Sequence, residues 1–290
     1  MALDRSNRYP GRFENPTSAS PQGAFKNRTS PTAQDGSYFE ADWANDWDGF
    51  FARILNVAGA TPNGTMDTGS ASQLYDALMS ATPGRLLKRT VFTSSGLFVP
   101  QSNTKLIIVE VQGAGGGGGS AVATASGTMS AGAGGGAGGY ALGYLTTIPS
   151  SQTVVVGNGG LAASSGGQSS FGTVIGLGGG GGDSSGSTAF PDNALRQYVG
   201  GAGGIGTNGS VNRRGGNGGS TLLTTSGNLI GGEGGASCFS ATGIPPSGST
   251  GAGVTGTLGS GGTGAISSGG GAAQTGGSGG TGLVIVWEYS

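Results

Sequence analysis

The sequence predicts a mainly β and irregular fold: an N-terminal extended segment, a short pair of α-helices, and then a glycine-rich domain of short strands and packed polyglycine II helices. Three observations predict it. Of the 68 glycines in the 290 residues, 59 lie between Gly113 and Gly282. Apolar, strand-like segments bound that stretch, residues 105–111 before it and residues 283–287 after it. A helical spacing of apolar residues occurs ahead of it, over residues 43–57.

The glycine-rich stretch is neither collagen nor a flexible linker. Collagen needs glycine at every third position, whereas residues 115–119 are all glycine. A linker is poor in β-branched and aromatic residues, but strand-forming residues fill positions 140–148, 152–156, 171–177 and 222–230. A polyglycine II helix has three residues per turn and no internal hydrogen bonds, so neighbouring helices must satisfy its N–H and C=O groups. We therefore expect a bundle of such helices, closed by strands.

Composition divides the chain into residues 1–36, 37–84 and 85–290. The first segment is rich in Pro, Ser, Asn and Arg without apolar periodicity, which predicts extended backbone that needs a partner surface to become ordered. A helix follows, with Asp35 or Asp42 as its expected cap and Gly59 at its end. Its apolar residues are spaced 4, 3, 4 and 3 apart, which is the seam of a coiled coil. The seam residues are Trp43, Trp47, Phe50, Ile54 and Val57.

The seam has two interpretations. The helix either packs on its own chain or associates with copies of itself through the five seam residues. A second helix is expected over residues 71–78, capped by Thr68 or Ser70, and the two could form a hairpin. Pro83 and Gly84 then end the helical segment.

Charge and cysteine content restrict the classes of function. Residues 91–290 contain four basic and five acidic residues, which leaves no basic stripe for nucleic acid. The single Cys238 permits no intramolecular disulfide and no multi-cysteine metal site. The N-terminus lacks an apolar signal region, and the chain has no run of eighteen apolar residues, so we expect neither secretion by a leader nor insertion in a membrane.

Two patterns resemble catalytic or cofactor motifs without meeting their requirements. Gly113, Gly115 and Gly118 match the dinucleotide fingerprint, but no helical period and no acidic residue follow at the required distance. The chain has no histidine, so the remaining enzymatic option is a pair of carboxylates. Asp183, Asp192 and Glu233 are its only members, and each lies where a solvated carboxylate is expected. We predict a protein that is not an enzyme and that has no cofactor or metal.

Two parts of the sequence resemble tailed-bacteriophage tail-fibre and receptor-binding proteins. The segments FKNRT (25–29) and ADW (41–43), with the helical pair, resemble the head by which such chains attach to the particle. A second set resembles their glycine-rich C-terminal domain: VFTSSGLFVP (91–100), KLIIVEVQGAGGGGG (105–119), GGYALGYL (138–145), TVVVGNGG (153–160) and GLVIVWEY (282–289). In the related adhesins of T-even-type phages the tip is a separate chain, whereas here head and tip share one chain.

The resemblance implies a tail-fibre subunit of the virion, assembled in the host cytoplasm and usually trimeric. Its N-terminal region would attach to tail or baseplate proteins. Loops of the glycine-rich domain would bind a bacterial outer-surface protein or glycan. An alternative function is a purely structural tail or baseplate component whose glycine-rich domain packs on neighbouring subunits.

Segments between the glycine runs carry the chemistry that a receptor-binding surface needs, since aromatic residues and arginine dominate binding hot spots. They lie in residues 183–199, 205–214 and 236–247. Covering the edges of the bundle is an equally good explanation for any one of these side chains. The candidates are Phe190, Arg196, Tyr198, Arg213, Arg214, Phe239, Ile244 and Pro245.

Overall fold

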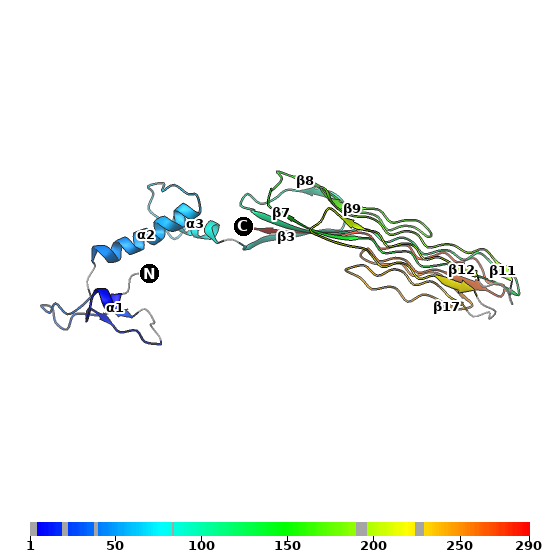
Figure 1. Ribbon diagram of the computed structural model, residues 1–290, viewed down its shortest axis with the longest axis horizontal. Helices are drawn as coiled ribbons and strands as arrows, with labels where there is room; N and C mark the ends of the chain where they lie inside the picture. The colour runs from blue at the N-terminus through cyan, green and yellow to red at the C-terminus, as the bar shows by residue number, and fades with distance from the viewer. Residues whose placement is uncertain (1–4, 19–22, 38–39, 83, 190–195, 224–228) are drawn as a thin grey trace. The chain divides into compact units, whose positions relative to one another are not determined.

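The computed structural model describes residues 5–18, 23–37, 40–82, 84–189, 196–223 and 229–290. The chain divides into two compact units, Met1–Pro83 (unit 1) and Gly84–Ser290 (unit 2). Helices occur in unit 1 alone among these residues, while unit 2 consists of short antiparallel strands and irregular backbone (Figure 1). The predicted mainly β and irregular fold class is therefore confirmed.

The start of unit 1 has more local structure than the extended segment that the sequence predicted. It contains α1 (Arg5–Arg8) and the antiparallel pair β1 (Phe13–Glu14) and β2 (Ala24–Phe25). The rings of Phe13 and Phe25 lie opposite each other in this pair, with centroids 5.3 Å apart. An aromatic contact across two strands, with Phe25 still 51% exposed, supplies an ordering interaction that the composition of this segment did not suggest.

Helix α2 (Ala41–Val57) covers the predicted seam and ends as predicted, because Gly59 adopts a φ of +67° just after the helix. The predicted cap is wrong. Glu40 occupies the N-cap position without a side-chain bond, and Asp42 lies in the first turn. Asp35 instead accepts hydrogen bonds from N and Oγ1 of Thr29, at 3.0 and 2.7 Å.

Helix α3 (Gln73–Ala81) packs against α2, and its cap also differs from the prediction. Ser72 is the N-cap, and its hydroxyl accepts from the backbone N–H of Tyr75 at 3.0 Å. The Asp67 carboxylate supports this end by accepting from Ser72 Oγ and from the backbone N–H groups of Gln73 and Leu74, at 2.8–3.1 Å. These bonds, that of Ser72 first, lower the pKa of Asp67. A cap supplied from five residues upstream is missed when only adjacent residues are considered.

Unit 2 begins and ends in two five-stranded antiparallel sheets, which we call the base. The first sheet has the order β14 (Val211–Arg213), β7 (Tyr140–Leu145), β5 (Leu106–Gln112), β20 (Leu283–Tyr289) and β3 (Leu86–Phe92). The second has the order β13 (Gly206–Thr207), β10 (Val174–Gly176), β9 (Ser169–Phe171), β8 (Gln152–Val155) and β4 (Gly96–Phe98). The strand predicted over residues 171–177 is thus a hairpin, because Gly172 turns the chain with a φ of +57°.

The core of the base lies between these sheets. Alternate residues of β5 and β20 point inward and are fully buried, as period-two strands require. Phe98 and Phe171 face them from the second sheet, with ring centroids 5.4 Å apart. This core accounts for every second apolar residue of the strands that bound the glycine-rich stretch.

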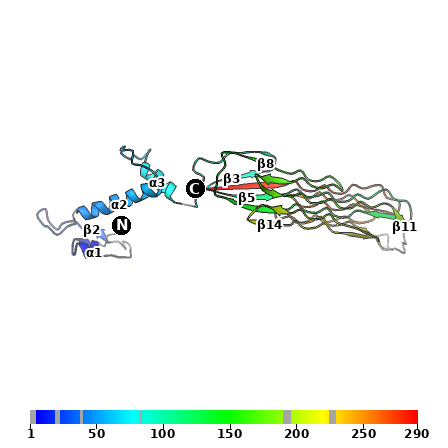
Figure 2. The same ribbon diagram turned by 45° about the horizontal axis from the view of Figure 1, so that its top comes forward.

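Beyond the base, the glycine runs pack side by side as polyglycine II helices (Figures 1 and 2). Along residues 113–119, every third N–H donates to the same neighbouring run, at N···O distances of 2.7–3.1 Å. The three neighbours are residues 133–139, 164–167 and 277–280, and each runs antiparallel to the donor. A repeat of three residues facing three directions is the signature of this helix and confirms the predicted packing.

The same run is surrounded on all sides. Its carbonyl groups accept from three further segments, residues 160–163, 179–182 and 262–265, at 2.9–3.0 Å. Six neighbours therefore satisfy the backbone of residues 113–119, which contains the fingerprint-like glycines. These N–H groups are bonded within the bundle, so they do not form a phosphate-binding loop.

Space makes glycine necessary in this bundle. A Cβ at Gly115 would lie 1.9 Å from the carbonyl oxygen of Ser260, and one at Gly134 would lie 1.6 Å from that of Glu233. Neither glycine has a positive φ, so an L-residue could adopt the backbone conformation but could not fit.

The end of unit 2 away from the base, which we call the tip, consists of small sheets. One has the order β11 (Thr188–Ala189), β6 (Thr128–Ala131), β19 (Ile266–Ser268) and β18 (Thr250–Gly251). Two strand pairs complete it, β12 (Arg196–Tyr198) with β15 (Thr221–Leu223) and β16 (Leu229–Ile230) with β17 (Ser247–Gly248). A second core lies here, formed by Met129, Ala131, Leu223, Leu229 and Ile266. The strand predicted over residues 222–230 corresponds to the separate strands β15 and β16.

Candidate functional site

The tip is the free end of unit 2, because both ends of the unit's chain lie at the base. The backbone N–H of Gly84 donates to the carbonyl of Ser290 at 2.9 Å, and that of Ser290 donates to Arg85 at 3.0 Å. Figure 1 shows the C-terminus at the end of the unit that carries β3 and β7, while β11, β12 and β17 lie at the opposite end. A surface at the tip is therefore held away from the point where the chain enters the unit.

The tip exposes apolar side chains on strands whose alternate residues form its core. Leu223 and Leu229 point inward, whereas Leu222 and Ile230 are 51% and 66% exposed. Arg196 is the one charged residue in the described tip strands, and Tyr198 packs beside the core. In its described strands this surface is thus apolar and rich in Ser and Thr, with Arg196 as the single cation.

The predicted loop residues do not gather in one place. Arg196 and Tyr198 lie in β12 at the tip, and Ile244 and Pro245 lie in the segment that leads to β17. Phe190 is outside the described residues, as is Asp192. The remaining three, Arg213, Arg214 and Phe239, lie at the base.

The base residues of this set have local partners that explain them. The ring of Phe239 contacts that of Tyr140 with centroids 6.0 Å apart, and Arg213 is paired with Tyr140 across β14 and β7. Arg214 donates through Nε to the carbonyl of Gly203 at 3.1 Å, which ties it to the bundle. These contacts favour the interpretation that the three residues cover the scaffold.

Sequence reasoning missed Leu222 and Ile230. The sequence pattern predicts one strand over residues 222–230, and none of the receptor-binding candidates lies in a predicted strand. The sequence does indicate them: residues 221–223 (TLL) and 229–230 (LI) each contain two adjacent apolar residues, and adjacent residues of a strand face opposite sides. One apolar residue of each pair must then face solvent or a partner.

Cys238 lies beside a cluster of polar side chains around Glu110. Tyr140 Oη donates to Glu110 Oε2 at 3.0 Å, and burial together with this carboxylate raises the pKa of Tyr140 above its usual range. The backbone N–H of Cys238 bonds to Gln112 Oε1 at 3.3 Å. Cys238 is exposed to solvent, but the protein atoms that surround part of it raise the pKa of its thiol, which disfavours the reactive thiolate.

Asp183 and Glu233, the two described carboxylates that an enzyme of this sequence could use, lie in separate environments. Asp183 Oδ2 accepts from the backbone N–H of Val199 at 3.1 Å. Glu233 is exposed beside a glycine run whose Gly219 donates to its backbone carbonyl. Within the ranges that the structure describes, no three His, Cys, Asp or Glu side chains lie together as a metal site requires.

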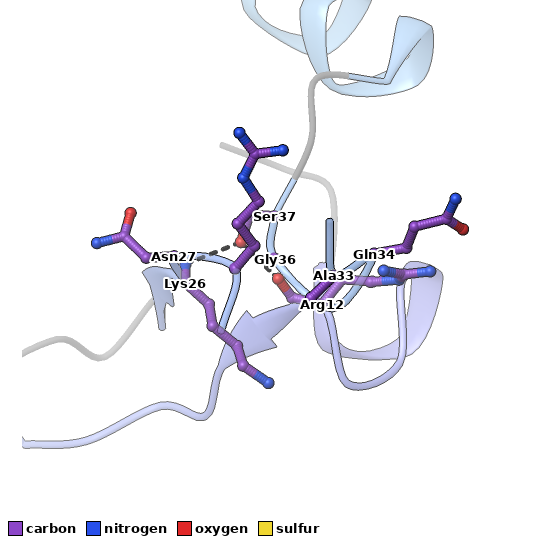
Figure 3. Close-up of a pocket in the computed structure, with 8 residues that line it drawn as sticks. Arg12, Lys26, Asn27, Ala33, Gln34, Gly36 and Ser37 are labelled. Atoms are coloured by element: carbon purple, nitrogen blue, oxygen red, sulfur yellow. Dashed lines mark hydrogen bonds between the residues drawn. The ribbon is translucent and has the colours of Figure 1, made fainter. Parts of the chain in front are cut away.

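Unit 1 contains an open hollow of about 660 Å³ that is rich in positive charge. Arg12, Lys26 and Arg28 line it, and Ser37 closes its floor by accepting from the backbone N–H of Lys26 at 2.9 Å and donating to the carbonyl of Arg12. Lys26, Asn27 and Gln34 point away from one another (Figure 3). The hollow is therefore a cationic surface without a set of convergent groups.

The seam of α2 is partly exposed: the ring of Trp43 packs on that of Phe25 in the same chain, with centroids 5.5 Å apart, while three of the five seam residues are exposed. No residue of α2 is buried, and Trp47, Phe50 and Val57 are 38%, 53% and 52% exposed. The rings of Trp43 and Trp47 lie 6.0 Å apart, and those of Trp47 and Phe50 lie 6.5 Å apart. A continuous row of rings on an exposed helix face is a surface suited to a partner.

No protein-family model matches the chain, and no curated protein is significantly similar to it. None of the described helices has the length and apolar character needed to cross a bilayer.

Proposed function

We propose that this chain is a subunit of a bacteriophage tail fibre that binds a bacterial surface receptor. Unit 1 attaches to tail or baseplate proteins, and the tip of unit 2 contacts an outer-surface protein or glycan. The observation that carries this proposal is the bundle: a scaffold in which each inner run bonds to six neighbours, and which holds an exposed apolar tip away from the first and last residues of unit 2.

A rigid scaffold suits recognition, because surfaces that are already ordered lose less conformational entropy on binding. Exposed Leu222 and Ile230 provide apolar contact area, and Tyr198 and Arg196 provide residue types enriched in hot spots. The side of the bundle also exposes single apolar residues such as Leu161, but the tip combines two of them with Tyr198 and Arg196 on its strands.

Copies of the chain associate through α2 in this proposal, and the resemblance favours three copies. Association would bring several tips to one cell surface. Linked binding events gain about 10²–10⁴ in avidity where the geometry allows simultaneous contact, so a modest affinity at each tip suffices.

The decisive experiment measures binding of the purified full chain to permissive bacterial cells, in competition with particles that carry the fibre. We expect saturable binding that the double substitution Leu222→Ser and Ile230→Ser weakens at least about tenfold, the effect of losing two buried leucine-sized contacts. Leu161→Ser is the matched control, because Leu161 is 73% exposed on the bundle.

A second pair of variants separates the two ends of unit 2. Tyr198→Ala tests the tip, and Phe239→Ala tests the base, with folding checked by circular dichroism. Weakening by Phe239→Ala alone would move the receptor surface to the base. A folded chain that binds no permissive host would favour the structural alternative.

A further inference from the structure

The strands of the first base sheet continue the runs of the bundle without a break in the chain. β5 (Leu106–Gln112) leads directly into residues 113–119, and β20 (Leu283–Tyr289) directly follows the run that ends at Gly282. Figure 2 shows the strands of the base lying along the length of the bundle. A force along the bundle is therefore also directed along the strands of this sheet.

The chain enters unit 2 through an edge strand of this sheet, at the end far from the bundle. β3 pairs with β20 from Leu86, opposite Tyr289, to Phe92, opposite Val284, so it begins farthest from the bundle and ends beside it. Among the described strands its one neighbour is β20, which is held on its other side by β5. A pull on Gly84 away from the tip therefore draws β3 lengthwise along β20.

Lengthwise tension and sideways peeling act differently on the bonds between these strands. Six residue pairs join β3 to β20, and the hydrogen bonds of an antiparallel pair lie perpendicular to the strands. Lengthwise tension shears all of these bonds at once, so several must break in one step. When two strands are peeled apart from adjacent ends, the bonds break one pair at a time.

Three features oppose sliding of β3 along β20. Leu87 has no opposite residue in β20, so it is the extra residue of a bulge, and a bulge pins the register of a sheet. Phe92, at the bundle end of β3, packs against the core of the base. The guanidinium carbon of Arg89 lies 4.9 Å from the centre of the Trp287 ring. Sliding toward the start of the chain would draw Phe92 out of the core and Arg89 off the ring.

We propose that the pairing of β3 with β20 is a mechanical clamp, which keeps unit 2 folded while the tip is held and unit 1 is pulled. The source of the tension rests on the proposed function, in which the particle holds unit 1 and the cell holds the tip. Movement of the particle relative to the cell then reaches unit 2 through β3. We expect β3 to give way first, because the inner runs of the bundle are bonded to six neighbours and β3 is paired with one.

Single-molecule force measurements on the full chain, pulled in two directions, test the clamp. In a Cys238→Ser background one handle is fixed at the N-terminus and the other at Gly186→Cys beside β11 at the tip, where an added Cβ meets no atom within 4 Å. The comparison molecule carries its second handle on a cysteine added after Ser290, which bonds to Gly84 and Arg85 at the start of β3. The first direction shears β3 along β20, and the second peels the two strands apart.

The measured quantity is the time for which unit 2 stays folded under a constant force. We expect this lifetime to be at least about tenfold longer in the first direction, because several hydrogen bonds must break there in one step. Unfolding of unit 1, residues Met1–Pro83, occurs in both directions and is recognised by the length of chain that it releases. Equal lifetimes in the two directions would overturn the proposal.

Phe92→Ala separates the clamp from general stability. It should shorten the lifetime at least about fivefold in the first direction and change it less than about twofold in the second, because residue 92 lies at the end of β3 that is peeled last. An equal effect in both directions would also overturn the proposal. Circular dichroism identifies a Phe92→Ala chain that does not fold, and Arg89→Gln then replaces it.

These measurements need no receptor, so they fail separately from the proposed function. A chain that shows the directional difference but binds no permissive cell would support the clamp and contradict receptor binding. A chain that binds cells but has equal lifetimes in the two directions would do the reverse.

Discussion

Single residues in the bundle are limited by the space around each Cα rather than by backbone conformation. We predict that Gly134→Ala lowers the free energy of unfolding by about 3 kcal/mol or more, because its Cβ would overlap the Glu233 carbonyl and two bonded runs would have to separate. Thermal and denaturant melting followed by circular dichroism measures the change. Gly186→Ala is the control, since no atom lies within 4 Å of the Cβ it adds; equal losses in both would contradict the space argument.

Glu288 is a second residue whose neighbours define its role. It is fully buried, and its Oε2 accepts from the backbone N–H of Gln101 at 2.7 Å and from Thr104 Oγ1 at 3.0 Å. Glu288→Ala leaves both donors without this acceptor, so we expect a loss of about 1–3 kcal/mol in unfolding free energy. Glu233→Ala, at an exposed carboxylate, should stay within about 0.5 kcal/mol of wild type in the same melts.

At the scale of elements, the start of α3 depends on an ionised Asp67. The pKa of Asp67 is lowered in the folded chain, so the cap contributes its full stability above the ordinary aspartate value near 4 and loses it as the pH falls through the lower folded value. We expect the amide resonances of Gln73 and Leu74 to shift together below about pH 4. Asp67→Asn should abolish this transition while Asp76→Asn preserves it; an unchanged titration in Asp67→Asn would exclude the carboxylate as its cause.

The α2 seam gives a prediction about assembly. Trp47→Lys and Phe50→Lys place charges on the exposed row of rings and should lower the average mass of the full chain in sedimentation. Asn45→Lys adds the same charge on the opposite side of the helix and should leave the mass unchanged. If all three variants sediment like the wild type, α2 packs on its own chain or plays no part in association.

At the scale of the whole molecule, the composition of the chain was sufficient to predict the glycine-rich bundle but not the structure at its two ends. The glycine runs are flanked by strand-forming residues, and the polyglycine II helix repeats every three residues. Together these predict that the runs form backbone hydrogen bonds with one another, whatever their order in the bundle. The pairing of runs was not predictable, because glycines carry no side chain that distinguishes one neighbour from another. Arg213 and Phe239 were predicted as receptor contacts although they lie at the base. The sequence does not say at which end of the bundle a segment lies.

The distribution of charge over unit 2 leads to a prediction about receptor binding. Arg196 is the one charge in the described tip strands, and the sequence adds Asp192 close to it. Binding at the tip would then rest on apolar and hydrogen-bonding contacts, which salt screens little, whereas binding to a polyanion through several cations weakens steeply with salt. We expect the cell-binding affinity of the full chain to change by less than about threefold between 50 and 500 mM NaCl, within the effect of one exposed ion pair. Arg196→Gln should remove any residual dependence; a loss of tenfold or more in wild type would indicate instead that the cationic hollow of unit 1, with Arg12, Lys26 and Arg28, contacts the cell.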